Sequence, residues 1–235
     1  MSKQLLEKAT PSHLHFINET LTKIVADNVV KTGDSVFDVG ANAGWHTRNL
    51  SRLVGANGVV HAFEPNPLHW TALLNVSSVR LWPHAVGNRI SAETFYFAIG
   101  HDEAASLHDP RDWIGSNVDM RYLSVLQADI DSLEEACRKP ISFIKMDVER
   151  NEFQALLGAR KVIERDHPIV VLEGDSSEIM DLMRPMGYRR HSLARGVAKL
   201  PNALYVLEGA NEEAIVPSDT MIEKTIQEAF KRFPI

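Results

Sequence analysis

Cysteine is nearly absent from this 235-residue sequence, and several other features are missing altogether. The single cysteine, Cys137, excludes intramolecular disulfides and a cysteine-rich zinc site, and it fits a reducing compartment. No run of about 18 apolar residues occurs, and residues 1–21 lack the apolar core of a signal peptide. We therefore expect a cytoplasmic protein without a membrane partner.

Basic tracts are absent as well. The 25 lysines and arginines stand against 31 acidic residues, which gives a net charge of −6. Because such a chain is poorly suited to a phosphate backbone, we expect no nucleic-acid partner. The remaining composition, 44% hydrophobic and 24% charged, is typical of a globular protein.

Short apolar runs alternate with stretches of helical periodicity along most of the chain. Strands are predicted at residues 35–40, 59–64, 79–86, 141–148, 168–173 and 204–208. Helices are predicted at residues 12–30, 45–54, 68–76, 152–164, 178–186 and 218–233. This alternation indicates βαβ units, and hence an α/β fold with a mostly parallel sheet.

No repeat or linker divides the sequence, so we expect a single domain over residues 1–235. Residues 1–32 would form a helical cap, residues 33–208 the core, and residues 209–235 a helical tail. Residues 87–131 form the irregular part of the core, with one extra strand at 94–99 and then a polar loop. The cap and this insertion are expected to cover the substrate side.

A glycine loop follows the first predicted strand, in the segment VFDVGANAGWHTRNL over residues 36–50. Gly40 allows a sharp turn, Gly44 allows the backbone to approach a ligand, and Asn42 can adopt a left-handed conformation. Glu64 ends the next strand, where an acid can accept hydrogen bonds from ribose hydroxyls. The combination indicates a nucleoside-bearing cofactor; the alternative is an ordinary strand-to-helix turn with a surface glutamate.

The dinucleotide fingerprint Gly-x-Gly-x-x-Gly is broken in this loop. Counted from Gly40, its second and third glycines would fall at Asn42 and Trp45. This argues against a nicotinamide-dependent oxidoreductase, which is one alternative function. Asp38, just before the loop, suits a ligand with an ammonium group, and S-adenosylmethionine carries one together with a ribose.

The sequence resembles the FkbM-type methyltransferases, within the class I S-adenosylmethionine-dependent group. Four blocks carry the resemblance in order: VFDVGANAGWHT, VHAFEPNP, ADIDSL followed by FIKMDVERNEFQALLGA, and PIVVLE. It implies a Rossmann-like fold with a mostly parallel seven-stranded sheet and helices on both faces. It also implies S-adenosylmethionine as cofactor, bound by Asp38, Gly40, Asn42, Gly44, Glu64, Pro65, Asn66, His84, Ala85 and Asp147.

We hypothesise that Asp147 or Glu149 takes the proton from an acceptor hydroxyl, because both follow the carboxyl end of a strand, where ligands bind. Alternatively, Asp147 only positions the cofactor, and Glu149 is an acid favoured by a helix N-terminus. The expected acceptor is a hydroxyl on a sugar, polyketide or similar small molecule. No metal site is expected, and a homodimer is left open.

Four further residues are candidates for substrate binding: His46, Ser106, Arg150 and Glu152. Arg150 departs from the family pattern, which has a glycine that can adopt a positive φ; an arginine does so less easily. This departure motivates another alternative, a cofactor-binding protein without catalysis. Trp45 is expected in the core, and Trp113 in a substrate lid.

Overall fold

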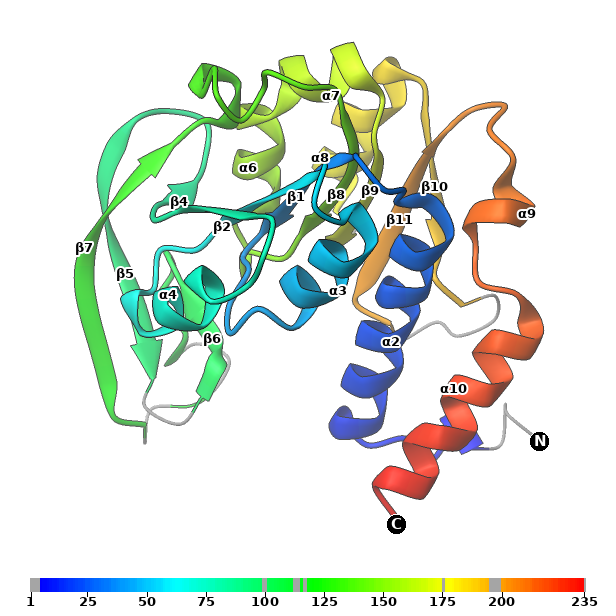
Figure 1. Ribbon diagram of the computed structural model, residues 1–235. Coiled ribbons are helices and arrows are strands. Elements are labelled where there is room, and N and C mark those ends of the chain that lie inside the picture. The colour runs from blue at the N-terminus through cyan, green and yellow to red at the C-terminus, as the bar shows by residue number, and fades with distance from the viewer. Residues whose placement is uncertain are drawn as a thin grey trace. The chain divides into compact units, whose positions relative to one another are not determined.

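The computed structural model describes residues 5–98, 101–111, 115, 118–174, 176–194 and 200–234. The chain forms two compact units (Figure 1). One is Val30–Pro168, which holds the glycine loop and both candidate catalytic acids. The other consists of Met1–Val29 and Ile169–Ile235.

Four parallel strands form the centre of the first unit: β1 (Ser35–Val39), β2 (Val59–Phe63), β3 (Val79–Trp82) and β8 (Ile141–Met146). They lie in the order β3-β2-β1-β8. Every residue of β1 is buried, as expected for a strand covered on both faces of a parallel sheet. Because the strands are parallel, the segments after β1, β2 and β8 meet at one edge of the sheet.

Helices follow three of these strands: α3 (Trp45–Val54) after β1, α4 (Pro67–Leu74) after β2, and α6 (Glu152–Gly158) with α7 (Arg160–Asp166) after β8. The single helix predicted over residues 152–164 is wrong, because the chain breaks at Ala159 and starts again as α7. The carboxylate of Asp131 caps this second start by accepting hydrogen bonds from the backbone N–H groups of Lys161 and Val162. Asp131 lies in a short 3-10 helix, η1 (Ile130–Ser132).

A second sheet occupies the region predicted to be irregular. It contains β4 (Ala85–Val86), β5 (Ser91–Ala98), β6 (His101–Ser106) and β7 (Met120–Ala128), in the order β4-β7-β5-β6. The strand predicted at residues 94–99 corresponds to β5, whereas much of the predicted polar loop is strand, in β6 and β7. The single strand predicted over residues 79–86 is wrong, because it is divided into β3 and β4. One face of this sheet is apolar and buried, since Phe95 and Val125 pack together with Ala85.

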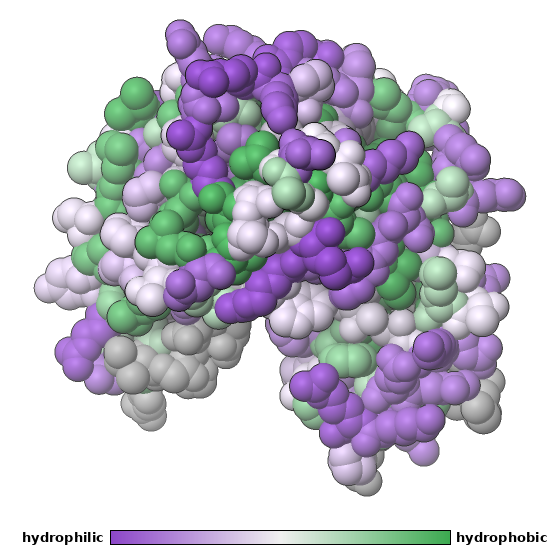
Figure 2. Space-filling view, viewed as in Figure 1, coloured by the Kyte–Doolittle hydropathy of each residue, from purple (hydrophilic) through white to green (hydrophobic). Residues whose placement is uncertain are grey.

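In the second unit, α2 (Pro11–Val29) packs against the helix α10 (Asp219–Arg232). The rings of His13 and Phe230 lie 4.0 Å apart between these two helices. Ser218 caps α10 through its side chain, as predicted. The outward face of α10 is hydrophilic (Figure 2), which fits a helix that buries Ile222, Ile226 and Ala229 on one side.

Three strands of the second unit pair antiparallel: β9 (Ile169–Glu173), β10 (Tyr188–Ser192) and β11 (Asn202–Leu207), with β11 in the middle. β10 was not predicted from the sequence, because its residues YRRHS contain no apolar run. The unit also contains α8 (Ser177–Met183), the 3-10 helix η2 (Arg184–Met186) and α9 (Glu212–Ile215).

The α/β Rossmann-like fold class is confirmed. The resemblance implied seven strands, and seven are present among the described residues besides those of the second sheet: four in the parallel group and three, including the unpredicted β10, in the antiparallel group. The strand pairing is therefore mixed rather than purely parallel. Among the described helices, none combines the length and the apolar character that a membrane span requires.

Candidate active site

The glycine loop after β1 has three residues with positive φ: Gly40 at 78°, Asn42 at 48° and Gly44 at 82°. The predicted left-handed conformation of Asn42 is thus confirmed. A Cβ on Gly40 would lie 1.7 Å from the carbonyl oxygen of Asp147. Gly40 is therefore required where the backbones that follow β1 and β8 come into contact.

Asp38 is fully buried in β1. Its Oδ2 atom accepts a hydrogen bond of 2.6 Å from the hydroxyl of Thr47 on α3. Its Oδ1 atom has no hydrogen-bond partner among the described residues. Because a buried acceptor without a donor is unfavourable by about 1–3 kcal/mol, this atom suits a donor group on a ligand.

Glu64, directly after β2, is 5% exposed. Its Oε2 and Oε1 atoms accept hydrogen bonds of 2.7 Å from the backbone N–H groups of Asn42 and Asn66, respectively. Burial raises the pKa of Glu64 to about 7, although these two N–H groups and the charge of Lys145 oppose the rise. The carboxylate is held against the glycine loop, and each oxygen retains a lone pair for a hydroxyl donor.

Two other expected cofactor residues lie next to Glu64. Pro65 is half-buried, and Asn66 is buried at the start of α4, where its side chain accepts a hydrogen bond from the N–H of Leu68. The Nδ2 atom of Asn66 has no hydrogen-bond partner among the described residues. It is therefore a second buried group that a ligand could engage.

His84 lies just before Ala85, the first residue of β4, and both are buried. Its Nδ1 atom is 3.0 Å from the carbonyl oxygen of Ala85, and burial lowers its pKa. A neutral ring that donates from Nδ1 to this carbonyl has Nε2 as an acceptor. Within the described part of the chain, Nε2 has no hydrogen-bond partner.

Asp147 and Glu149 follow β8 at the same edge of the sheet. The Oδ2 atom of Asp147 lies 3.1 Å from the Nζ atom of Lys145. Burial, followed by the charges of Asp147 and Glu152, raises the pKa of Glu149 to about 8. Two neighbouring carboxyl groups in different environments are typical of an acid–base site.

The backbone around Glu149 and Arg150 has positive φ at both residues, 52° and 75°. Arg150 thus adopts the conformation that a glycine would adopt more easily, and the turn is retained at the expense of strain. The Oε1 atom of Glu152 stabilises this turn, since it accepts hydrogen bonds from the N–H groups of Val148 and Arg150 at 3.1 and 3.2 Å. Substrate contact by Glu152 and Arg150 stays a prediction.

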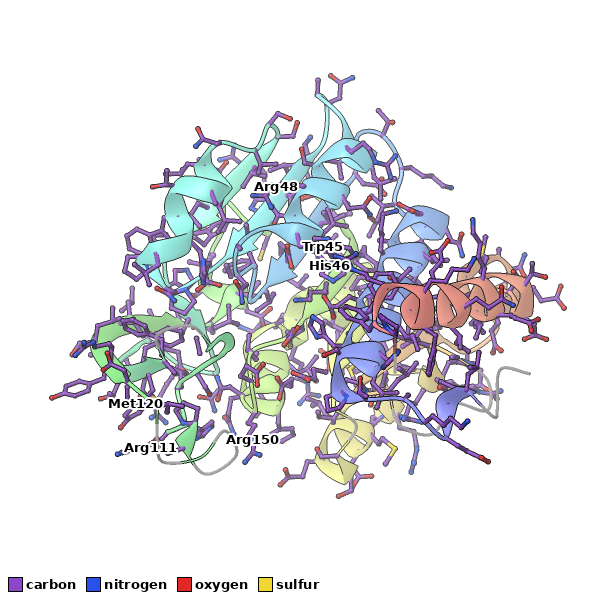
Figure 3. The ribbon with its side chains drawn as sticks, turned by 90° about the horizontal axis from the view of Figure 1, so that it is seen from below. Trp45, His46, Arg48, Arg111, Met120 and Arg150 are labelled. Carbon is purple, nitrogen blue, oxygen red and sulfur yellow. The ribbon has the colours of Figure 1, made fainter. Side chains whose placement is uncertain are left out.

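His46 and Ser106, the other two candidates for substrate binding, are both buried. Ser106, at the end of β6, donates a hydrogen bond to the carbonyl oxygen of Glu149. Figure 3 shows His46 beside Trp45 at the start of α3, and their rings meet edge to face at 4.6 Å. Trp45 is 51% exposed, so its predicted place in the core is wrong: it is on the outward side of an amphipathic helix. Trp113 lies outside the described residues.

Lys145 was not among the predicted site residues. It is a buried residue of β8, and its Nζ atom lies 3.3 Å from the carbonyl oxygen of Gly40. A lysine inside the otherwise apolar run ISFIKMDV was the available signal.

A hollow of about 430 Å³ on the second sheet was also missed. It is lined by Thr94, Tyr96, Arg111, Met120 and Tyr122. Tyr96 pairs with Tyr122 on one side and with Ser106 on the other, so all three side chains lie on the same face of this sheet. Figure 3 shows Arg111 and Met120 in this region.

Comparison with known proteins gives one family. The model described as the methyltransferase FkbM domain matches residues 38–190. A methyltransferase FkbM from Methylobacillus flagellatus KT is similar, with a TM-score of 0.47 and 18% identity. The match covers 87% of this chain, and this chain spans only 57% of the length of that one. A SAM-dependent methyltransferase from Aquifex aeolicus has a TM-score of 0.46 and 15% identity, with 87% and 97% of the two chains covered. No curated protein sequence gives a significant match.

Proposed function

The chain belongs to the FkbM methyltransferase domain family, and we propose that it methylates a hydroxyl group of a small molecule with S-adenosylmethionine as the methyl donor. The observation that carries the proposal is the pair Asp147 and Glu149, two acids in different environments beside the buried carboxylates of Asp38 and Glu64. Methyl transfer to a hydroxyl requires a cofactor site and a base close to it, and these residues fit both. We call the cofactor site at Asp38, Glu64 and His84 the cofactor cradle.

The cradle fits the functional groups of the cofactor. S-adenosylmethionine supplies a methyl group on a positively charged sulfonium, which is already activated for transfer. The free Oδ1 atom of Asp38 suits the ammonium group, and the second lone pairs of Glu64 suit the ribose hydroxyls. The Nε2 atom of His84 suits the amino group of adenine. Net negative charge in this cradle favours a positively charged ligand.

We assign proton removal to Glu149 and positioning to Asp147. An acceptor hydroxyl must lose its proton as it attacks, and the base must lie within hydrogen-bond reach. With a pKa of about 8, Glu149 changes between its two forms near neutral pH. Asp147 is held by the ammonium of Lys145, so its carboxylate has less freedom to follow an acceptor. Alignment itself contributes up to about 7–11 kcal/mol in favourable cases.

The residues of the second sheet favour a small acceptor molecule that contains a ring. Ser106 joins this sheet to Glu149, and Tyr96, its partner across the ladder, lines the hollow of about 430 Å³. The flat faces of Tyr96 and Tyr122 suit stacking against a sugar or a polyketide ring. Arg111 is already held by the carboxylate of Asp109, so the hollow is not specialised for an anion.

Two experiments test the proposal in turn. The first is thermal unfolding with S-adenosylhomocysteine, compared with NAD. At 100 times its dissociation constant, a bound ligand adds about 2.7 kcal/mol, or roughly 5–10 °C for this chain length. We expect a shift with S-adenosylhomocysteine alone, lost in Asp38→Ala and Glu64→Ala but kept in the exposed control Glu134→Ala. A shift with NAD alone would favour the oxidoreductase alternative.

The second experiment measures transfer of labelled methyl from S-adenosylmethionine to sets of sugars, phenols and amines. We expect label in a hydroxyl acceptor, and at least a hundredfold less in Glu149→Gln if this residue is the base. Label in an amine only would contradict O-methylation. Cofactor binding without transfer to any acceptor would favour the non-catalytic alternative.

A further inference from the structure

Lys145 is the one lysine or arginine that is buried in the part of the chain that the structure describes. It lies in β8 between Ile144 and Met146, two fully buried apolar residues. Burial of an ammonium group is unfavourable unless its charge and its hydrogen bonds are satisfied. A lysine at this position therefore needs an explanation beyond strand formation.

The contacts of Lys145 connect two strand ends. Lys145 is paired in register with Asp38 on the neighbouring β1. Its Nζ atom lies 3.3 Å from the carbonyl oxygen of Gly40 and 3.1 Å from Oδ2 of Asp147. The ammonium thus bridges the glycine loop and the segment that carries the catalytic acids. This is the same junction at which Gly40 leaves no room for a Cβ next to Asp147.

The charge of Lys145 acts on more than its direct partners. It lowers the pKa of Glu64 and also that of Glu149, and it thereby opposes the effect of burial on both groups. The charges of Asp147 and Glu152 raise the pKa of Glu149. The charge of Arg150 lowers it, as that of Lys145 does. Because Arg150 is exposed, Lys145 supplies the buried positive charge here. We call the carboxyl groups around it the acidic cluster: Glu64, Asp147, Glu149 and Glu152.

We propose that Lys145 is a positioning residue of the active site: its ammonium holds the Gly40 carbonyl and the Asp147 carboxylate together, and its charge favours the ionised forms of the neighbouring carboxyl groups. Its role in methyl transfer rests on the function proposed above. Its role in the acidic cluster is a property of the protein without any ligand.

The test compares Lys145→Met, which keeps a similar shape without the charge, with Lys145→Arg and with the exposed control Lys139→Met. In the ligand-free protein, carbon-13 NMR follows the titration of the Glu149 carboxyl group. We expect its midpoint to rise by about one pH unit in Lys145→Met, because a nearby opposite charge is lost. Lys145→Arg is expected to restore most of this difference, and Lys139→Met to match the wild type.

Calorimetry then measures the affinity for S-adenosylhomocysteine across pH. We expect Lys145→Met to bind about tenfold more weakly at pH 7, with the pH dependence displaced to higher pH, and Lys145→Arg to bind more tightly than Lys145→Met. A residue that only supports folding would lower stability and leave both the titration and the pH dependence unchanged. That result would overturn the proposal.

If Lys145→Met does not fold, nitrogen-15 NMR of the lysine ammonium groups in the wild-type protein answers the same question. We expect the Lys145 signal to change as Glu149 titrates and again when S-adenosylhomocysteine is added; a signal that follows neither would overturn the proposal. If the wild type does not bind S-adenosylhomocysteine, the proposed function fails, while the Glu149 titration still decides the electrostatic role of Lys145.

Discussion

The hydroxyl of Ser106 donates a hydrogen bond of 2.6 Å to the carbonyl oxygen of Glu149. The same hydroxyl accepts a hydrogen bond from the backbone N–H of His108, at 3.0 Å. Ser106 is 1% exposed, so water does not replace either partner readily. The end of β6 is in this way coupled to the turn that carries the proposed base.

We expect Ser106→Ala to destabilise the turn at Glu149, because the carbonyl of Glu149 and the backbone N–H of His108 both lose their partner. The free energy of unfolding should fall by about 1–3 kcal/mol. Hydrogen exchange of a peptide that covers residues 147–151 should become at least tenfold faster, whereas Ser124→Ala, an exposed serine of β7, should change neither quantity. Unchanged exchange in Ser106→Ala would mean that Glu152 alone stabilises the turn.

Gly40→Ala should destabilise the protein much more than Gly33→Ala. Both glycines have positive φ, but a Cβ on Gly33 meets nothing within 4 Å. Gly33→Ala should therefore only add the conformational strain of about 1–2 kcal/mol. Gly40→Ala adds the contact with the backbone of Asp147, and we expect at least about 4 kcal/mol or no folded protein. Equal denaturation midpoints for the two variants would contradict this close approach.

Arg150→Gly should be more stable than Arg150→Ala. Both variants remove the arginine side chain, but only glycine adopts the positive φ of 75° without strain. The expected difference in the free energy of unfolding is about 1 kcal/mol in favour of glycine. Urea denaturation of the two variants measures it, and a more stable alanine variant would show that the turn is not left-handed in solution.

Glu149→Gln should stabilise the protein at pH 8. The pKa of Glu149 is about 8 in the folded protein, against an ordinary value of 4.5. Between these two values the folded state holds a proton that the unfolded state has lost, so wild-type stability falls as the pH rises through this window. Glutamine removes this loss, and we expect a gain on the order of 2 kcal/mol at pH 8 and little at pH 4.

The measurement for Glu149→Gln is chemical denaturation at several pH values, with Glu134→Gln as an exposed control. The difference from the wild type should grow with pH only for Glu149→Gln. A constant difference, independent of pH, would place the titration elsewhere in the molecule.

Much of the fold could be predicted because burial leaves a clear pattern in the sequence. The fully buried β1 and β8 are apolar runs, and the Ser218 cap of α10 is a local feature. β10 and the second sheet could not be predicted in the same way. β10 is polar, and β7 alternates so that only one of its faces is buried. The break at Ala159 depends on Asp131, which is distant in sequence.

The glycine loop and the acids at the ends of β1, β2 and β8 could be predicted from the amino-acid sequence alone, because their spacing follows the strand–turn–helix order. Which atoms of these residues already have a hydrogen-bond partner depends instead on how the chain packs. The free Oδ1 of Asp38, the raised pKa of Glu149 and the bridge made by Lys145 all arise from segments that are far apart in the chain. Burial and the contacts between distant charges depend on packing in three dimensions, and no local pattern of residues specifies them.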